Sequence, residues 1–200
     1  MPLAHFTNVT TANSIWEPIF KGLFEVQIDL PPLVASNLGA DIRGLLLENA
    51  TSVPLPSYPK FTPKEQRFKY STRVYATLPG ETHLTEQTIK FNLNQVVPTP
   101  NNPSPGYVVG KVPIFRAMKD WYDLIWNNET GQLNYKVNTM GTVTIDQHDK
   151  EGLVIRRIIW HNAFLTGWSG WDGDLSWDST GEIQDLSASF AVDYWEDFYY

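Results

Sequence analysis

The sequence contains no cysteine, no long apolar run and fewer basic than acidic residues. Without cysteine the chain can form neither a disulfide framework nor a thiolate metal site, and it has no cysteine nucleophile. No stretch reaches the roughly eighteen consecutive apolar residues of a membrane-spanning helix, and residues 1–18 do not follow the pattern of a secretion signal. We therefore expect a protein that is made and kept in a cytoplasm-like compartment and does not enter a membrane.

The shortage of basic residues also argues against a protein that grips nucleic acid. The chain has 22 acidic and 15 basic residues, which gives a formal net charge of -7. Binding to phosphates needs a surplus of Lys and Arg. We expect DNA that meets this protein to be repelled rather than held.

The residues that are abundant favour β-structure. Aromatic residues make up 14% of the chain, with 8 Trp, 9 Tyr and 10 Phe, and bulky side chains suit a pleated surface. Two hundred residues with 42% hydrophobic content are enough for the core of one domain. The sequence therefore predicts a single, mainly β domain over residues 1–200, with an extended arm at 1–18 and a proline-rich loop at 96–112.

Alternating patterns predict most of the strands. Apolar residues at every second position mark 24–30, which ends at Pro31-Pro32. The same alternation marks 186–195 as a strand with one buried face. Further strands are predicted at 45–53, 66–77, 83–94, 139–146 and 153–165.

Two of these strands, 66–77 and 83–94, are predicted to form one long hairpin. The segment 78–81 between them contains Pro79-Gly80, which supplies a turn. One face of this hairpin carries polar side chains and the other carries apolar ones. The apolar anchors are Phe68, Tyr70, Val74, Ile89, Phe91 and Leu93.

One amphipathic helix is predicted at 113–127. Pro113 stands where a first helical turn tolerates proline, and apolar residues follow at spacings of three and four. Such a stripe indicates packing against the sheet, which we favour over a ligand-binding role for its aromatic residues. The stripe consists of Ile114, Phe115, Met118, Trp121, Tyr122, Ile125 and Trp126.

The segment 167–178 is the best place for small-molecule chemistry. Its acidic residues Asp172, Asp174 and Asp178 could offer oxygen ligands to calcium. The glycine and the distal glutamate of a standard calcium loop are absent at their offsets, however. Calcium binding is therefore a weak alternative here.

The tryptophans of the same segment offer a second alternative, a platform for sugar rings. Trp168, Trp171 and Trp177 could stack on such rings, although a turn anchored by aromatic residues is the favoured interpretation. Gly167-Trp168-Ser169-Gly170 is one residue short of a nucleophile elbow. The four histidines share no metal-ligand spacing, and no phosphate-binding loop is present. We expect no catalytic, metal or cofactor site and no enzyme activity.

The C-terminal stretch contains Trp177-Asp178-Ser179, Glu182-Ile183-Gln184 and Asp193-Tyr194-Trp195-Glu196. This series of short motifs resembles the end of the tail tube proteins of contractile-tailed bacteriophages. The similarity is strongest from about Gly173 to Glu196 and weaker at 22–28 and 50–56. The tail Phe198-Tyr199-Tyr200 departs from the family pattern, as do the loop at 96–112 and the longer N-terminal arm. The matching residues are Trp177, Asp178, Glu182, Ile183, Gln184, Asp193, Tyr194, Trp195 and Glu196.

This resemblance implies a fold and a function. The fold is a β-sandwich or open barrel with one flanking helix, in which the hairpin at about 66–94 contributes to a barrel between subunits. Six copies form a ring, and stacked rings form a hollow tube through which DNA leaves the virion, inside a contractile sheath. The implied partners are other copies of the chain, the sheath, the baseplate and tape measure proteins, and genomic DNA in transit. The implied location is the virion tail, after assembly in the host cytoplasm.

Three alternatives stay open on the sequence. A baseplate tube initiator would share the fold and form one terminal ring. The inner tube of a type VI or other contractile injection system is a near relative of the same idea. A monomeric carbohydrate-binding β-sandwich, using Trp168, Trp171 and Trp177, belongs to a different class.

Overall fold

The structure is a computed structural model that describes residues 21–38, 42–56, 62–68, 71–77, 86–94, 112–170 and 184–200, with the backbone alone at 62–68 and 71–77. The arm at 1–18, and the loop at 96–112 apart from Val112, lie outside these residues. The mainly β fold is confirmed. The elements are β1 (Phe24–Asp29), α2 (Pro32–Leu38), α3 (Ile42–Asn49), β2 (Ala50–Ser52), β3 (Thr62–Phe68), β4 (Ser71–Thr77), β5 (Gln87–Asn92), α4 (Pro113–Ile125), β6 (Trp126–Asn127), β7 (Gln132–Leu133), α5 (Lys136–Thr139), β8 (Gly141–His148), β9 (Val154–Ser169), β10 (Asp185–Ala191) and β11 (Tyr194–Tyr199).

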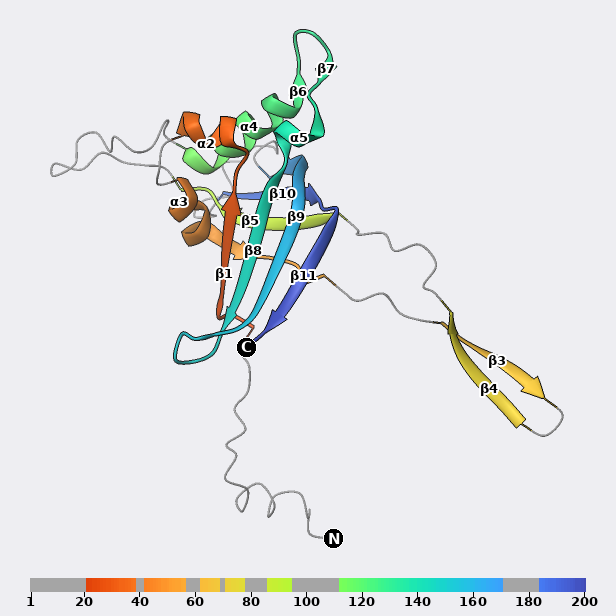
Figure 1. The fold of residues 1–200 in the computed structure, drawn as a ribbon. Coiled ribbons are helices and arrows are strands. Elements are labelled where there is room, and N and C mark those ends of the chain that lie inside the picture. The colour runs from red at the N-terminus through yellow and green to blue at the C-terminus, as the bar shows by residue number, and fades with distance from the viewer. Residues whose placement is uncertain are drawn as a thin grey trace, which may run out of the picture.

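Seven strands form one antiparallel sheet in the order β1-β8-β9-β10-β5-β2, and β11 also pairs with β9. The long strand β9 joins two layers. Its residues 154–163 pair with β8 and 156–161 with β11, whereas 164–169 pair with β10. Figure 1 shows β1, β8, β9 and β11 side by side, with β5 and β10 running across behind them. The sheet thus folds over on itself and encloses a core.

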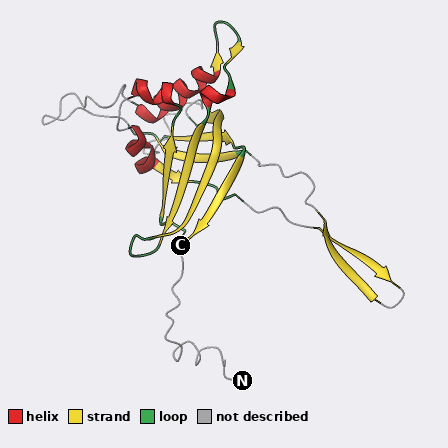
Figure 2. Cartoon of the chain, in the orientation of Figure 1, coloured by secondary structure: helices red, strands yellow, loops and turns green. Residues whose placement is uncertain are grey.

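The core lies between these two layers and the helices, which gather at one end and along one side of the strands (Figure 2). Trp121 of α4 is fully buried, with its ring centroid 5.5 Å from that of Phe190 in β10. Its indole Nε1 donates a hydrogen bond to the Thr139 carbonyl oxygen at 2.8 Å. Burial of such a large side chain with its one donor satisfied stabilises the contact between helix and sheet.

The prediction of a single flanking helix is wrong, because four helices are described. The Pro31-Pro32 pair ends β1 as expected but also begins α2, where the amide of Val34 donates to the Pro31 carbonyl at 2.9 Å. Proline is well tolerated in a first helical turn. Among the described residues, no helix is long and apolar enough to cross a membrane.

The segment 45–53 was predicted as a strand and is mostly helix. It forms the greater part of α3, and only Ala50–Ser52 is extended. The Asn49 side chain donates to the Leu45 carbonyl at 2.8 Å, within the last turn. Leucine and glutamate are good helix formers. In a run this short, the helical period of 3.6 residues cannot be distinguished from the strand period of two.

The predicted hairpin between 66–77 and 83–94 is also wrong. The chain reverses between Phe68 and Ser71, which pair with each other, so β3 and β4 form the hairpin. The strand β5 pairs instead with β10 and β2. The alternating pattern runs on across the reversal, and Pro79-Gly80 is the stronger turn signal, so the sequence indicates the wrong turn.

The predicted strand at 186–195 is two strands with a corner between them. Leu186, Ala188 and Phe190 of β10 are fully buried, as their alternation predicts. Beyond Ala191 the chain turns and pairs with a different part of β9, and Tyr194 is half exposed. Apolar and polar residues continue to alternate across this corner, so the sequence pattern does not reveal it.

Candidate assembly surfaces

Three of the six predicted assembly residues lie inside this chain. Ile89 and Phe91 of β5 are fully buried in the core of this chain, and Leu93 is 9% exposed. They pack inside one subunit and are not available to a neighbour. Tyr70 and the side chains of Phe68 and Val74 lie outside the described residues.

The hairpin β3–β4 is set apart from the rest of the sheet. Its seven register pairs, from Thr62↔Thr77 to Phe68↔Ser71, form a separate two-stranded sheet. Figure 1 shows it projecting away from the other strands. An isolated two-stranded hairpin is marginally stable in water, and its outer edges present unpaired backbone groups. The hairpin is therefore the part of the described chain most in need of a partner.

The helix stripe packs on the sheet over most of its length. Ile114, Met118 and Trp121 are buried, and Phe115, Tyr122 and Ile125 are half-buried against the core. Trp126 lies beyond the helix, which ends at Ile125 rather than at 127. The Trp126 indole donates to the Asn128 side chain at 2.7 Å in the small β6–β7 hairpin.

Trp168, a candidate for sugar binding, is held in an aromatic cluster. Its ring meets Phe115 edge-on at 6.0 Å and Tyr122 at 5.1 Å, both from α4. These contacts use the tryptophan to fix the helix on β9. Trp171 and Trp177 lie outside the described residues, as do the possible calcium ligands Asp172, Asp174 and Asp178.

Part of the C-terminal family motif gathers at the corner between β10 and β11. Asp193 accepts hydrogen bonds from the Lys136 ammonium group and, at 3.1 Å, from the Asn162 side-chain amide. The bond from Lys136 holds the pKa of the Asp193 carboxyl below its usual value, with a smaller contribution from Asn162. Asn162 has a positive φ of 55° and sits at the bulge of β9. This corner polar cluster comprises Lys136, Asn162 and Asp193.

The next motif residues line the edge of the sheet. Tyr194 stacks on His161 with ring centroids 4.5 Å apart, and the His161 Nε2 lies 3.1 Å from a Glu196 carboxylate oxygen. Trp195 is half-buried against the core. Gln184 donates to the Gly170 carbonyl oxygen. Trp177, Asp178, Glu182 and Ile183 lie outside the described residues.

Two bidentate ion pairs lie on the strands that meet β9. Arg156 donates to Asp197 at 2.9 and 2.6 Å, and Arg157 donates to Asp146 at 2.7 Å through both nitrogens. The Asp197 and Asp146 side chains are only 2% and 6% exposed. The bond to Asp146 raises the pKa of Arg157. Paired geometry of this kind offsets the cost of burying the carboxylates.

Exposed apolar side chains gather at both ends of β8. Before β8 stand Leu133, Tyr135 and Val137, at 71%, 81% and 72% exposure. After it comes Leu153, at 62%, beside the end of β11, where the Tyr200 amide bonds the Ile155 carbonyl. Figure 1 places these two regions at opposite ends of the sheet. The sequence did not predict either region. A pattern of polar and apolar residues does not show which apolar side chains remain exposed to solvent in the fold.

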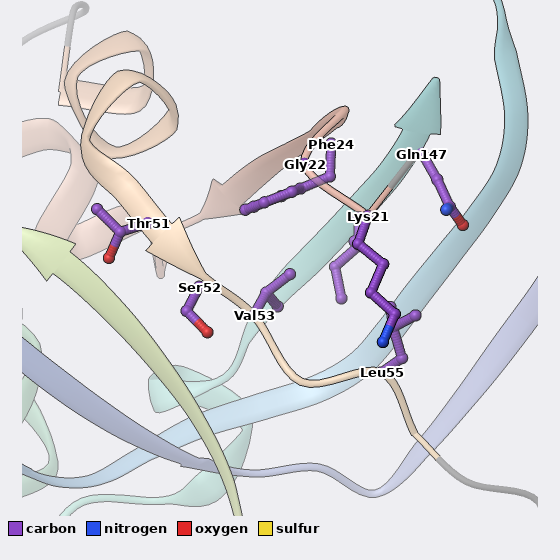
Figure 3. A pocket seen from close by; sticks show the side chains of 9 residues that line it. Lys21, Gly22, Phe24, Thr51, Ser52, Val53, Leu55 and Gln147 are labelled. Atoms are coloured by element: carbon purple, nitrogen blue, oxygen red, sulfur yellow. The ribbon is translucent and has the colours of Figure 1, made fainter. Parts of the chain in front are cut away.

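An apolar pocket opens between β1, β8 and the chain that follows β2 (Figure 3). Phe24, Val53, Leu55 and Ile145 supply its apolar walls, and Lys21 lies among the polar residues that line it. Nothing in this lining resembles a catalytic set. Throughout the described part of the chain, no three His, Asp or Glu side chains are grouped closely enough to hold a metal ion.

No protein-family model matches the chain, and no curated protein matches it in sequence. Solved structures do match. The tube-terminating cap of the anti-feeding prophage shares 17% identity and a TM-score of 0.50 over 100% of both chains. A chain of the sheath–tube complex of an extracellular contractile injection system, PVC, shares 16% identity and a TM-score of 0.52 over 97% of both. Its sheath/tube terminator shares 15% and 0.52, over 92% of this chain and 99% of that one.

The TM-scores establish a likeness of fold, which extends over nearly all of each chain. It agrees with the resemblance to tail tube proteins that the C-terminal sequence motif suggests. The protein therefore has the tail-tube-like fold found in contractile injection systems.

Proposed function

We propose that this chain is a structural, non-enzymatic subunit of the tube of a contractile tail, in which copies form rings that stack into a hollow conduit. The observation that carries the proposal is the fold match to contractile injection systems over 97% to 100% of both chains. A match of that extent concerns a complete domain rather than a shared sheet motif.

The projecting hairpin β3–β4 supports an assembling protein independently of the comparisons. Within the described residues its strands pair only with each other. A neighbouring copy that packs on the hairpin would give it the support that two strands lack in water, and would cover edges that otherwise invite aggregation.

The finer features of the proposal follow the resemblance to bacteriophage tail tubes. They are hexameric rings, a surrounding sheath, contacts with baseplate and tape measure proteins, assembly in the host cytoplasm and a final place in the virion tail. The net charge of -7 favours a conduit that lets DNA pass without holding it. The inner tube of a type VI or other contractile injection system is the near alternative.

A second candidate is a ring that starts or ends the tube. Two of the structures named above favour it, since one is described as a tube-terminating cap and another as a sheath/tube terminator. A carbohydrate-binding module is less favoured, because Trp168 is already engaged by Phe115 and Tyr122.

Negative-stain electron microscopy of the purified protein, over a range of concentrations, tests the proposal. Long hollow tubes are the expected result. Rings that never stack would indicate an initiator or terminator rather than a tube subunit. A monomer that persists at high concentration would overturn both.

Proline substitutions in β4 test the part played by the hairpin. Arg73 pairs with Gln66 and Val74 with Glu65, and successive amides of a strand point to opposite edges. Arg73→Pro and Val74→Pro therefore remove one donor facing β3 and one facing outward. Both should abolish rings, whereas the matched Arg73→Ala and Val74→Ala variants should keep them. Rings formed by both proline variants would show that the hairpin is dispensable for assembly.

A further inference from the structure

Two solvent-exposed surfaces with apolar side chains lie at opposite ends of β8. The upper knob consists of Leu133, Tyr135 and Val137, carried by the end of β7 and the start of α5. The lower hollow is lined by Asp149, Leu153, Val154, Ile155, Arg157 and Tyr200, and lies where β9 begins. We propose that the knob of one copy seats in the hollow of the next copy, end to end.

The side chains of the upper knob are largely uncovered by their own chain. Its three side chains are 71% to 81% exposed, and in Figure 1 β6 and β7 project beyond the helices. Three large apolar side chains exposed within five residues form a patch of the kind that marks a protein interaction site. Tyr135 combines an apolar ring with a hydroxyl group, which suits a contact that has one wet side.

The lower hollow has the chemistry to receive such a side chain. Leu153 is 62% and Tyr200 74% exposed, so its walls are apolar and open to solvent. Asp149 and Arg157 contribute polar groups to the lining. Asp149 already holds the loop in place, because its carboxylate accepts from the amides of Glu151 and Leu153 at 2.8 Å. The turn that carries Leu153 is therefore ordered by the chain itself.

One chain cannot bring its own knob to its own hollow. The eight residues of β8 separate them, a length of roughly 25 Å at about 3.3 Å per residue. β8 is held between β1 and β9 in the middle of its layer, so this separation is rigid. The contact must be made between different molecules.

A second copy fits these surfaces better than an unlike partner does. Contact between different surfaces of identical molecules repeats from copy to copy, so each internal copy buries its knob and its hollow together. An unlike partner at one end would leave the other apolar surface in water. A chain with both halves of the contact can extend an assembly in both directions, which favours a tube subunit over a terminating ring.

This inference rests on the proposed function, and complementation between two variants tests it. Tyr135→Asp places a charge on the knob and Leu153→Asp places one at the hollow. Both residues are exposed, so each variant should keep the circular dichroism spectrum of the unmodified protein. Leu33→Asp is the matched control, since Leu33 is 57% exposed on α2 and belongs to neither the knob nor the lining of the hollow.

Stacking is measured by sedimentation velocity and negative-stain microscopy. Each variant alone should lose stacking while keeping its rings, and Leu33→Asp should stack normally. When preformed rings of the two variants are mixed in equal amounts, they should form assemblies of two layers and no more, because rings of a single variant allow only one intact knob–hollow pairing. Normal stacking by either variant, or a mixture without two-layer assemblies, would overturn the knob–hollow contact alone. An unmodified protein that remains monomeric would overturn the proposed function and the contact with it.

Discussion

Asp193 and Asn162 join two corners of the fold, with the Asn162 amide donating to the Asp193 carboxylate at 3.1 Å. Asn162 stands where β9 passes from its pairing with β8 and β11 to its pairing with β10, and Asp193 stands between β10 and β11. The Asp193 amide also donates to the His161 carbonyl at 3.2 Å. These hydrogen bonds hold the two bends opposite each other. The bends set the relative directions of β8, β9, β10 and β11.

The left-handed backbone at Asn162, with φ of 55°, gives the first prediction. Asn162→Ala should lower the free energy of unfolding by about 1–2 kcal/mol, because alanine pays the left-handed penalty and loses the bond to Asp193. Asn162→Gly should cost less than Asn162→Ala, since glycine adopts this φ freely. Urea denaturation of both variants measures the difference. An alanine variant as stable as the glycine variant would contradict the argument.

The depressed pKa of Asp193 gives a pH dependence. A carboxyl whose pKa is lower in the folded state stabilises the fold above its unfolded pKa of about 4, and this stability is lost as the pH falls through the folded value. Lys136→Met removes the largest cause of the depression. The difference in stability between the unmodified protein and Lys136→Met should therefore be present at pH 7 and shrink below about pH 4. A difference that stays constant from pH 7 to pH 2, measured by thermal unfolding, would exclude this linkage.

Gly141 has no room for a side chain. A Cβ atom there would lie 2.5 Å from the Asp29 carbonyl oxygen and 2.9 Å from the Trp121 ring. Gly141→Ala should destabilise the protein by about 2–3 kcal/mol through overpacking. Gly44 in α3 is the matched control, because nothing lies within 4 Å of its added Cβ. Gly44→Ala should raise stability by about 0.5–1 kcal/mol, and equal effects of the two substitutions on Tm would refute the packing argument.

The Arg156–Asp197 pair should matter more than an ion pair on the surface. Arg156→Met deprives a carboxylate that is 2% exposed of its cation, with an expected cost of about 3 kcal/mol. Lys119→Met breaks a pair with Asp123 in which both side chains are nearly half exposed, and should cost about 0.5 kcal/mol or less. Guanidinium denaturation of the two variants compares them directly. Similar costs would mean that burial of Asp197 does not decide the strength of its pair.

Local patterns were enough to predict the strands whose two faces differ. The alternation at 24–30 corresponds to β1, where Val26 and Ile28 are 1% exposed and Glu25 faces outward. The helix at 113–127 follows equally from its stripe and from Pro113. In these elements one face is buried and the other is exposed to solvent, so the spacing of the apolar residues predicts which side chains are buried.

The errors arise where long-range pairing decides the structure. Residues 66–77 alternate like one strand, but the chain reverses between Phe68 and Ser71 without glycine or proline. The corner at Asp193 is invisible for a related reason, because Lys136 and Asn162 that hold it are distant in sequence. The upper knob and lower hollow could not be predicted either. The exposure of Tyr135 and Leu153 depends on how the other helices and strands pack around them, which local sequence does not show.

The pairing of β1 with β8 has a consequence for synthesis on the ribosome. Phe24 pairs with Gln147 and Asp29 with Thr142, so β1 waits for a partner that is translated 113 to 123 residues later. At about 5–20 residues per second this wait lasts on the order of 6–25 seconds. During it, Val26 and Ile28 have no partner strand to cover them, and non-local pairing of this kind also forms slowly. We therefore expect a chaperone that binds short apolar segments to protect this part of the nascent chain.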